Sequence, residues 1–451
     1  MDKNLNERAL SYHSDGRPGK TEVVPTKPFG TQKELSMAYT PGVAAPATEI
    51  SKERWKAYRY TNKGNLVAVV TNGSSVLGLG DIGALASKPV MEGKAMLFKV
   101  YADIDAFDIE ISDKEADKII TTIQALAPTF GGINIEDIKS PECFYIEDRL
   151  RRLLDIPVLH DDQHGTAVVI AAALINACEL TEKEFGKINI LICGAGAAGI
   201  STAKMLRNMG VKKEHITMVD SKGVINIERN DLNSLKSEFA VCSRHKTLHE
   251  AIKGCDVFIG LSRGNLLYDS DIMEMSRNPI IFALANPVPE ISYEKAKKLR
   301  PDAIVATGRS DKPNQINNVL AFPYLFRGAL DTLATNINEE MKIAAAQAIA
   351  RIAHEHVPHD IEEKFGGRFV FGKEYLLPKP GDKRLLTEVS SAVAKAAIQS
   401  GIARRNIASF KEYALTLLSR VNNDLFFASE RLRHNDVATL YRNRKKREHE
   451  F

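Results

Sequence analysis

Residues 187–199 read KINILICGAGAAG. The apolar run at the start predicts a buried β-strand, and the six residues after it match the pattern G-x-G-x-x-G. Glycines at these places permit a tight turn, the close approach of a pyrophosphate, and close packing of the next helix on the strand. Free N–H groups at the start of that helix attract phosphate. We take this turn as a candidate dinucleotide site, formed by Gly194, Ala195, Gly196, Ala197, Ala198 and Gly199.

The chain after this turn alternates short apolar runs with helical stretches. Strands are predicted at 215–220, 255–261 and 279–285, with helices at 199–208 and 231–239. Strands separated by helices indicate a parallel sheet with right-handed crossovers. We therefore expect a Rossmann-like, doubly wound α/β domain here.

Asp220 ends the second strand, 21 residues after Gly199, where a carboxylate that binds the ribose of NAD belongs. Such a carboxylate repels the 2′-phosphate of NADP. Lys222 follows at once, however, and its ammonium group is able to pair with that phosphate. The sequence leaves the choice between NAD and NADP open.

The bulk composition is that of a globular chain. Its 451 residues suggest two or three domains, and a net charge of +4 does not indicate a nucleic-acid partner. The five cysteines are dispersed without a CxxC pair, which favours reduced thiols. The N-terminus lacks a signal-peptide pattern, and no run approaches the ~20 apolar residues of a membrane span. We expect a cytoplasmic protein without membrane contact.

The first part of the chain has a mixed pattern. Strand-like runs occur at 66–71 and 94–101, and the apolar stretch 166–179 predicts a helix buried between two domains. We expect an N-terminal α/β catalytic domain at 1–160 and a nucleotide-binding domain at 161–405. A helical, basic tail is expected at 406–451.

Acidic pairs follow two of the apolar runs. In VLHDDQHGTAVV (158–169) they are Asp161 and Asp162, and in GGINIEDI (131–138) they are Glu136 and Asp137. One such acid caps a helix, but two are costly to bury without a partner. If both pairs meet at one sheet edge, their oxygens suit Mg²⁺ or Mn²⁺. We predict a divalent metal site beside the nucleotide domain.

Several longer strings together resemble the malic enzymes of bacterial type, the decarboxylating malate dehydrogenases. They occur in that family's order over roughly residues 8–405: SMAYTPGVA (36–44), TNGSSVLGLGDIG (71–83), MEGKAMLFK (91–99), NIEDI (134–138), HDDQHGTA (160–167), FALANPVPE (282–290) and NNVLAFP (317–323). The stretch YHSDGRPGKTEV (12–23) is similar to a subgroup often fused to a phosphate-acetyltransferase-like domain. We expect no such fusion in a chain of this length.

The resemblance implies a role for each matching residue. Tyr39 is expected to be the general acid and Lys94 the general base. The expected metal ligands are Glu136, Asp137 and Asp162, with Asp161 behind them or capping the helix. Asn286 and Asn318 are expected to contact substrate and nicotinamide.

One position departs from the larger relatives. Where they carry an arginine that binds the substrate carboxylate, this chain has Ser75. Ser74 and Ser75 are then candidate substrate contacts, with backbone N–H groups of residues 73–75 or a distant cation meeting the carboxylate.

The implied reaction is oxidative decarboxylation of (S)-malate to pyruvate and CO₂, with reduction of NAD or NADP and Mg²⁺ or Mn²⁺ as the ion. The base would need a lowered pKa. A homo-oligomer, dimeric or larger, is expected. Two alternatives remain: a metal-free dehydrogenase of hydroxy or amino acids, and an inactive nucleotide sensor.

Overall fold

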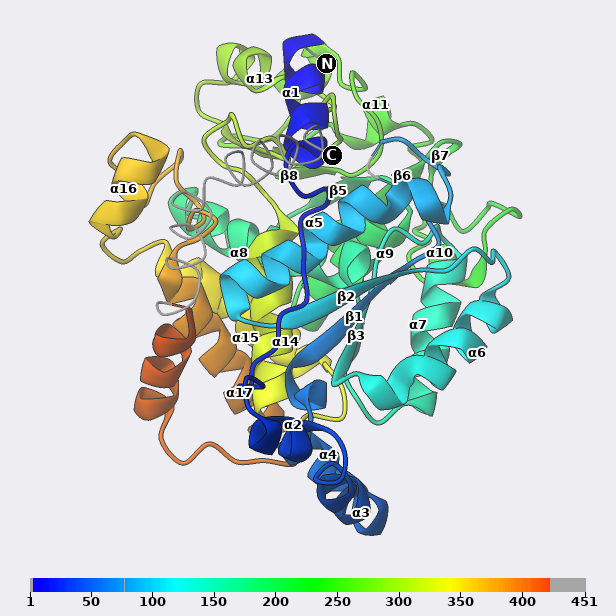
Figure 1. Ribbon diagram of the computed structural model, residues 1–451. Helices are drawn as coiled ribbons and strands as arrows, with labels where there is room; N and C mark the ends of the chain where they lie inside the picture. The colour runs from blue at the N-terminus through cyan, green and yellow to red at the C-terminus, as the bar shows by residue number, and fades with distance from the viewer. Residues whose placement is uncertain (1–2, 77, 422–451) are drawn as a thin grey trace, which may run out of the picture.

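The computed structural model describes residues 3–76 and 78–421, which form two parallel sheets surrounded by helices (Figure 1). The first sheet has the order β2-β1-β3-β4, and all its strands are parallel. Its strands are β1 (Leu66–Thr71), β2 (Asp105–Glu110), β3 (Gly132–Ile135) and β4 (Val158–His160). The crossovers run through α5 (Ala84–Ala102), α6 (Ala116–Leu126) and α7 (Glu142–Leu153). The carboxyl ends of these strands therefore share one edge.

The second sheet has the order β10-β9-β8-β5-β6-β7 and is parallel except for the β6–β7 pair. Its strands are β5 (Ile190–Cys193), β6 (Ile216–Asp220), β7 (Gly223–Val224), β8 (Val257–Gly260), β9 (Ile280–Ala283) and β10 (Ile304–Thr307). The chain reverses direction across the sheet between β5 and β8, where doubly wound sheets bind their ligands. The predicted Rossmann-like fold class is confirmed.

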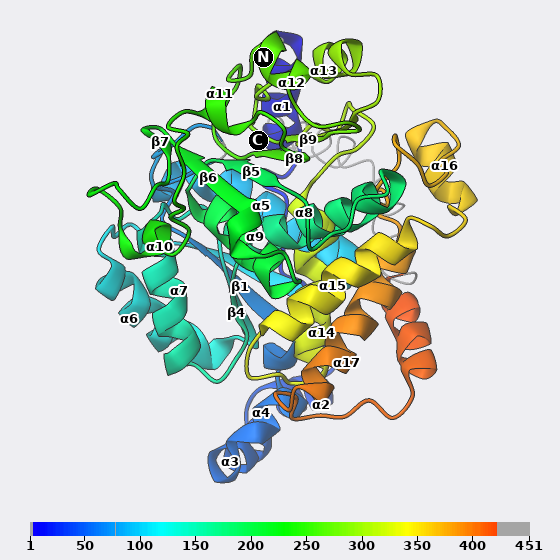
Figure 2. The same ribbon diagram turned by 180° about the vertical axis from the view of Figure 1, so that it is seen from behind.

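Helix α8 (Asp161–Leu180) joins the two sheets and is buried along most of its length (Figure 2). Its side chains share one apolar core with β1, β5 and β8. The helix is long and apolar enough to span a membrane, but 72% of that window lies buried inside the protein. Two acidic residues in its first turn complement the positive end of the helix dipole. The predicted buried helix is thus confirmed, and it begins five residues earlier than expected.

Helices of the C-terminal part cover α8 and the first sheet on one side (Figures 1 and 2). They are α14 (Phe322–Asp331), α15 (Glu339–Ile352), η6 (Leu385–Val389) and α17 (Ser390–Gln399). Residues 410–421 form a further helix. The rest of the predicted basic tail, 422–451, lies outside the described residues.

The remaining helices are shorter or peripheral. In chain order they are α1 (Lys3–Ser14), α2 (Gln32–Ala38), α3 (Ala44–Lys52), η1 (Arg54–Lys56), α4 (Ala57–Tyr60), η2 (Asn62–Asn65), η3 (Ala127–Thr129), α9 (Ala197–Asn208), η4 (Lys213–His215), α10 (Ser234–Ser237), α11 (Leu248–Ala251), α12 (Asp269–Met273), α13 (Tyr293–Leu299), η5 (Asn318–Leu320) and α16 (His359–Phe365). Helices α2, α3 and α4 contain no buried residue and project from the lower end of the molecule in both views (Figures 1 and 2).

The strand predicted at 94–101 is wrong, because these residues belong to α5. The buried positions Met91, Lys94, Phe98 and Ala102 recur every three or four residues, which is the period of a helix face. An eight-residue apolar run by itself does not reveal that period. The correction matters because it places Lys94 on the buried face of a rigid helix.

Candidate active site and cofactor cleft

Lys94 projects from the middle of α5 into a buried pocket of carboxylates. Its Nζ lies 2.5 Å from Oδ2 of Asp161 and 2.9 Å from Oε1 of Glu136, and 4.0 Å from the centre of the Phe322 ring. Burial lowers the pKa of Lys94, but the two carboxylates outweigh it and hold that pKa above its ordinary value. The protein groups by themselves therefore do not produce the lowered pKa that we expected for Lys94.

Asp161, the first residue of α8, connects Lys94 to the nucleotide domain. Its Oδ2 also accepts a hydrogen bond of 2.5 Å from Nδ2 of Asn318 at the start of η5. The residue one turn later is Gly165, and a Cβ there would lie only 1.8 Å from Oδ1 of Asp161. The glycine thus leaves room for the carboxylate to turn toward Lys94.

The three predicted metal ligands do converge. One carboxylate oxygen from each of Glu136, Asp137 and Asp162 lies within 4.8 Å of the others. Nδ2 of Asn134 donates to Glu136 at 2.8 Å, and the backbone N–H of Asp137 donates to Oδ2 of Asp162 at 2.8 Å. Burial raises the pKa of both Glu136 and Asp162. Three close carboxylate oxygens are a donor set that fits a hard divalent cation.

The loop after β1 lies beside this cluster, and its backbone N–H groups at residues 73–75 already have acceptors within the protein. The backbone N–H groups of Gly73, Ser74 and Ser75 donate respectively to Thr71 Oγ1, Asn72 Oδ1 and the carbonyl oxygen of Asp137. The Ser74 hydroxyl donates to Asn72 Oδ1 at 2.6 Å and accepts from the N–H of Lys139 at 3.0 Å. These N–H groups are therefore not available to a substrate carboxylate as we had suggested, whereas the Ser75 side chain is exposed.

Asn286 follows β9 and is exposed at the boundary of the two sheets. A Cβ on Gly308 would lie 2.7 Å from its Nδ2, and a Cβ on Gly78 would lie 3.1 Å from its carbonyl oxygen. The Asn286 loop thus lies against the residue that follows β10 and against the loop after β1. Asn318 reaches the site through its hydrogen bond to Asp161, whereas Asn286 lies near the loop after β1. Their contacts with substrate and nicotinamide remain a prediction.

Tyr39 is not brought to the site. It caps the end of α2 and is 70% exposed. Helix α2 lies at the lower end of the molecule, whereas α5 crosses its middle (Figures 1 and 2). Within one copy of the chain, Tyr39 is therefore separate from Lys94.

The glycine-rich turn forms one wall of a cavity of about 1000 Å³. A Cβ on Gly194 would lie 2.4 Å from the carbonyl oxygen of Leu261, and one on Gly199 would lie 1.9 Å from that of Gly194. A Cβ on Gly196 meets nothing within 4 Å and would project into open space. This is the cradle that a pyrophosphate requires. The cavity is also lined by Ala195, Asp220 and Lys222, while Ala197 and Ala198 begin α9.

Asp220 is held by cations rather than left open for a ribose. Both its oxygens accept from Arg229, at 2.8 and 3.0 Å, and Nζ of Lys236 lies 2.7 Å from Oδ2. Burial raises the pKa of Asp220, but these partners outweigh it and lower that pKa to about 2. Lys222 pairs instead with Asp231 at 2.8 Å. Sequence reasoning missed Arg229 and Lys236, because only the fold brings them to the end of β6.

Together these features define an α/β protein with a Rossmann-like candidate dinucleotide site and a lysine–carboxylate pair beside a three-carboxylate cluster. Comparison with known proteins agrees. Residues 18–151 match the family model for the malic enzyme N-terminal domain, and residues 163–362 match that for the malic enzyme NAD-binding domain.

Three similar proteins extend the match over most of the chain. An NADP-dependent malic enzyme of Rhizobium meliloti is 52% identical over 92% of this chain and 55% of its own length. An NADP-dependent malic enzyme of Halomonas elongata is 50% identical over 88% of this chain and 95% of its own length. The crystal structure of malic enzyme from Pyrococcus horikoshii has a TM-score of 0.86 at 42% identity, covering 95% of this chain and 99% of that one.

The chain belongs to the malic enzyme family, and the predicted resemblance is confirmed. It spans about half the length of the first curated relatives it matches, 55% in the case of the Rhizobium protein.

Proposed function

We propose that this chain oxidises and decarboxylates (S)-malate to pyruvate and CO₂, with reduction of NADP in preference to NAD. The observation that carries the proposal is the placement of Lys94 between Asp161 and Glu136, beside the three-carboxylate cluster. A proton-transfer group and a cation site in contact are what this chemistry needs.

We assign the divalent ion, Mg²⁺ or Mn²⁺, to Glu136, Asp137 and Asp162. When bound, it would polarise the C2 oxygen of the substrate as a Lewis acid and draw the charge of Glu136 away from Lys94. Asn318 orients Asp161, and Asp161 in turn orients the Lys94 amino group.

The protein groups move two protons in this scheme. In its neutral amine form, which the ion would favour by offsetting the charge of Glu136, Lys94 takes the proton of the C2 hydroxyl as hydride passes from C2 to the nicotinamide. Asp161 at 2.5 Å is placed to share that proton. After CO₂ leaves, a general acid must protonate C3 of the enolate, and Tyr39 is our candidate. Ser75 and Asn286 are exposed at the loops beside the site and are our candidates for holding the substrate carboxylates, with Ser74 supporting that loop.

Tyr39 requires a second copy of the chain. Helices α2–α4 bury no residue within one copy, yet they carry exposed apolar side chains, among them Leu35, Met37, Tyr39 and Trp55. Such a surface is typical of an interface. We propose a homodimer or larger oligomer in which this segment supplies Tyr39 to the partner's site.

The preference for NADP follows from the neutralised Asp220. Arg229 also pairs with Asp231, so Arg229, Lys236 and Lys222 together face the two carboxylates of Asp220 and Asp231. The end of β6 therefore keeps a net positive charge, which favours a 2′-phosphate. Lys246 lines the same cavity and adds to that charge.

We retain the domain ranges 1–160, 161–405 and 406–451 and a cytoplasmic location as parts of this proposal. Asp161, at the proposed boundary, contributes its side chain to the site of the first domain and its helix to the second.

The test is an absorbance assay at 340 nm with malate and Mn²⁺, run with NAD and NADP in parallel, with pyruvate and CO₂ quantified. We expect a faster reaction with NADP, one pyruvate per NADPH, and no turnover in EDTA. A metal-free dehydrogenase would keep its rate in EDTA and retain all substrate carbons. Cofactor binding without any malate oxidation would indicate an inactive sensor.

A further inference from the structure

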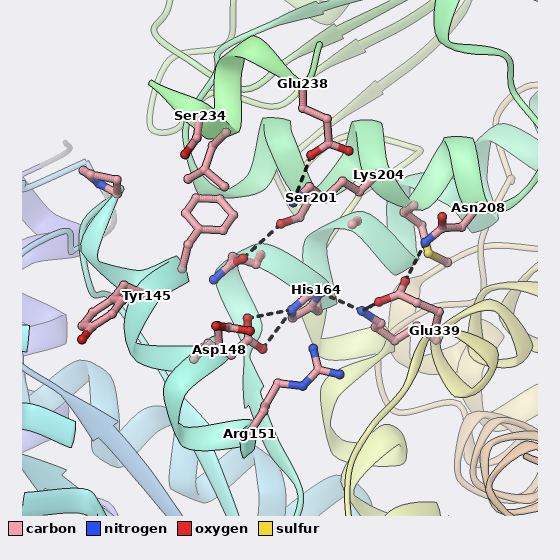
Figure 3. Close-up of a pocket in the computed structure, with 18 of the residues that line it drawn as sticks. Tyr145, Asp148, Arg151, His164, Ser201, Lys204, Asn208, Ser234, Glu238 and Glu339 are labelled. Carbon is pink, nitrogen blue, oxygen red and sulfur yellow. Dashed lines mark hydrogen bonds and ion pairs between the residues drawn. The ribbon is translucent and has the colours of Figure 1, made fainter. Parts of the chain in front are cut away.

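A second cavity, of about 880 Å³, is lined on one side by Gln163, His164 and Ala167 of α8 (Figure 3). It is lined by residues of α6, α7, α8, α9, α10 and α15, and so by helices that pack around both sheets. Apart from Pro141, different residues line this cavity and the cofactor cavity. It is not used by the proposed reaction.

The acidic groups in the walls already have cationic or histidine partners. Three contacts connect four of the lining residues. A carboxylate oxygen of Glu147 lies 2.9 Å from Nε2 of His164, and Nζ of Lys342 lies 3.1 Å from Nδ1 of the same ring. Lys342 also forms an ion pair with Glu339. The other acids and their partners are Glu142 with Lys139 at 3.5 Å, Asp148 with Arg152 at 2.9 Å, and Glu238 with Arg207 at 2.9 Å. One carboxylate oxygen of the walls, Oε2 of Glu142, has no hydrogen-bond partner among the described residues, whereas each of the acidic side chains has a cationic or histidine neighbour.

Several cationic side chains in the walls, by contrast, have hydrogen-bond donors that no carboxylate pairs with closely. The guanidinium of Arg151 bonds only to the neutral oxygens of Asn336 and Ile337, at 3.1 and 3.4 Å, and pairs with no carboxylate of the described residues. Nζ of Lys204 is 3.5 Å from Glu238. Figure 3 shows Arg151 on one side of His164 and Lys204 on the other.

The buried side-chain amide of Gln163 has a donor without a hydrogen-bond partner. The residue is 2% exposed, and its Oε1 accepts from Ser201 at 3.3 Å, whereas Nε2 has no hydrogen-bond partner among the described residues. A buried donor left without a partner costs free energy, so such groups are normally satisfied. Gln163 lines the cavity, and a ligand acceptor there would satisfy it.

The remaining walls are apolar, from Phe144, Ala167, Met205 and Leu235. We propose that this cavity binds a small organic anion, with a carboxylate or phosphate head held by Arg151, Lys204 and Gln163 and an apolar body against these side chains. Gln163 directly follows Asp162 of the metal cluster, so the bound anion also changes the affinity of that cluster for its ion. The site acts as an effector site.

The test uses benzoate and phenyl phosphate, which share a ring and differ in their anionic head. Isothermal titration of the full chain, without malate or dinucleotide, measures binding of each probe. We expect saturable millimolar or tighter binding of at least one probe, weakened about tenfold in Lys204→Met and in Arg151→Met, as for a lost charge-assisted hydrogen bond. Arg149→Met is the matched control, since Arg149 is an exposed residue of α7 outside the cavity, and it should bind as wild type.

The second measurement is the Kd for Mn²⁺ with and without saturating probe, which should differ. No saturable binding of either probe, equal binding by wild type and both cavity variants, or an unchanged Kd for Mn²⁺ would each overturn the proposal. Because binding is measured without substrate, these outcomes do not depend on whether malate is turned over.

Discussion

Nζ of Lys94 on α5 lies 2.5 Å from Oδ2 of Asp161, the first residue of α8. The two residues are 67 positions apart in the chain. Their contact joins the helix that follows the loop after β1 to the helix that leads into the nucleotide domain. The proposed base is thereby oriented by a residue at the junction of the two halves.

The Asp161→Asn variant tests this orientation. An amide keeps the size of the side chain but cannot share a proton with Lys94, so we expect kcat to fall by about 10²-fold or more. KM for the dinucleotide should change little. The control is Asp148→Asn, which removes an exposed partner of Arg152 on α7. An unchanged kcat in Asp161→Asn would remove Asp161 from the mechanism.

Gly165 is predicted to be required because a larger side chain would not fit beside Asp161. In Gly165→Ala the new Cβ would clash with Asp161 Oδ1 at 1.8 Å and crowd Asn318 Cβ at 3.1 Å. We expect lower kcat and a loss of about 1–3 kcal/mol in the free energy of unfolding, as for overpacking in a core. Gly93→Ala is the control, because a Cβ there meets nothing within 4 Å and alanine favours the helix.

Asp162→Asn should weaken the metal site more than the cofactor site. Removing one of three carboxylates is expected to raise the Kd for Mn²⁺ by at least about 10–100-fold, the loss seen even for residues outside the ligand shell. Titration with Mn²⁺ and with NADP, each on the resting protein, separates the two effects. Equal losses of both affinities would point to a misfolded variant rather than a lost ligand.

Arg229→Met should shift the cofactor preference toward NAD. Loss of the two Arg229 hydrogen bonds leaves Asp220 with Lys236 as its cationic partner and removes one positive charge, so the end of β6 attracts a 2′-phosphate less strongly. We expect KM for NADP to rise by about tenfold or more, with a smaller change for NAD. Arg277→Met, an exposed arginine outside the cofactor cavity, serves as the comparison.

Asp220 also predicts a pH dependence of stability. Its pKa of about 2 in the folded chain lies below the ordinary value of about 3.9, so the folded state is favoured above pH ~4 and loses that advantage as pH falls toward 2. Urea unfolding of wild type and Asp220→Asn should therefore converge as pH is lowered from 5 to 3. A difference that is constant over this range would contradict the assigned shift.

The amino-acid sequence predicted much of the site because strand-end motifs are local. The glycine turn after β5 and the acids after β3 and β4 each follow an apolar run, and parallel strands bring their carboxyl ends to one edge. The structure places Glu136, Asp137 and Asp162 together accordingly. Only the family resemblance identifies Lys94, because the local run 94–101 predicts a strand where the structure has helix α5.

What the sequence alone determined is the doubly wound sheet, the glycine cradle and the acidic strand ends, since these depend on neighbouring residues and on the period of the chain. Only the tertiary structure decided which charges meet. It paired Asp220 with Arg229 and Lys236, gave the N–H groups of residues 73–75 acceptors within the protein, and left Tyr39 on a projecting segment. Such pairings act through space over a few ångströms, and residues far apart in the chain reach that distance only when the whole core is packed.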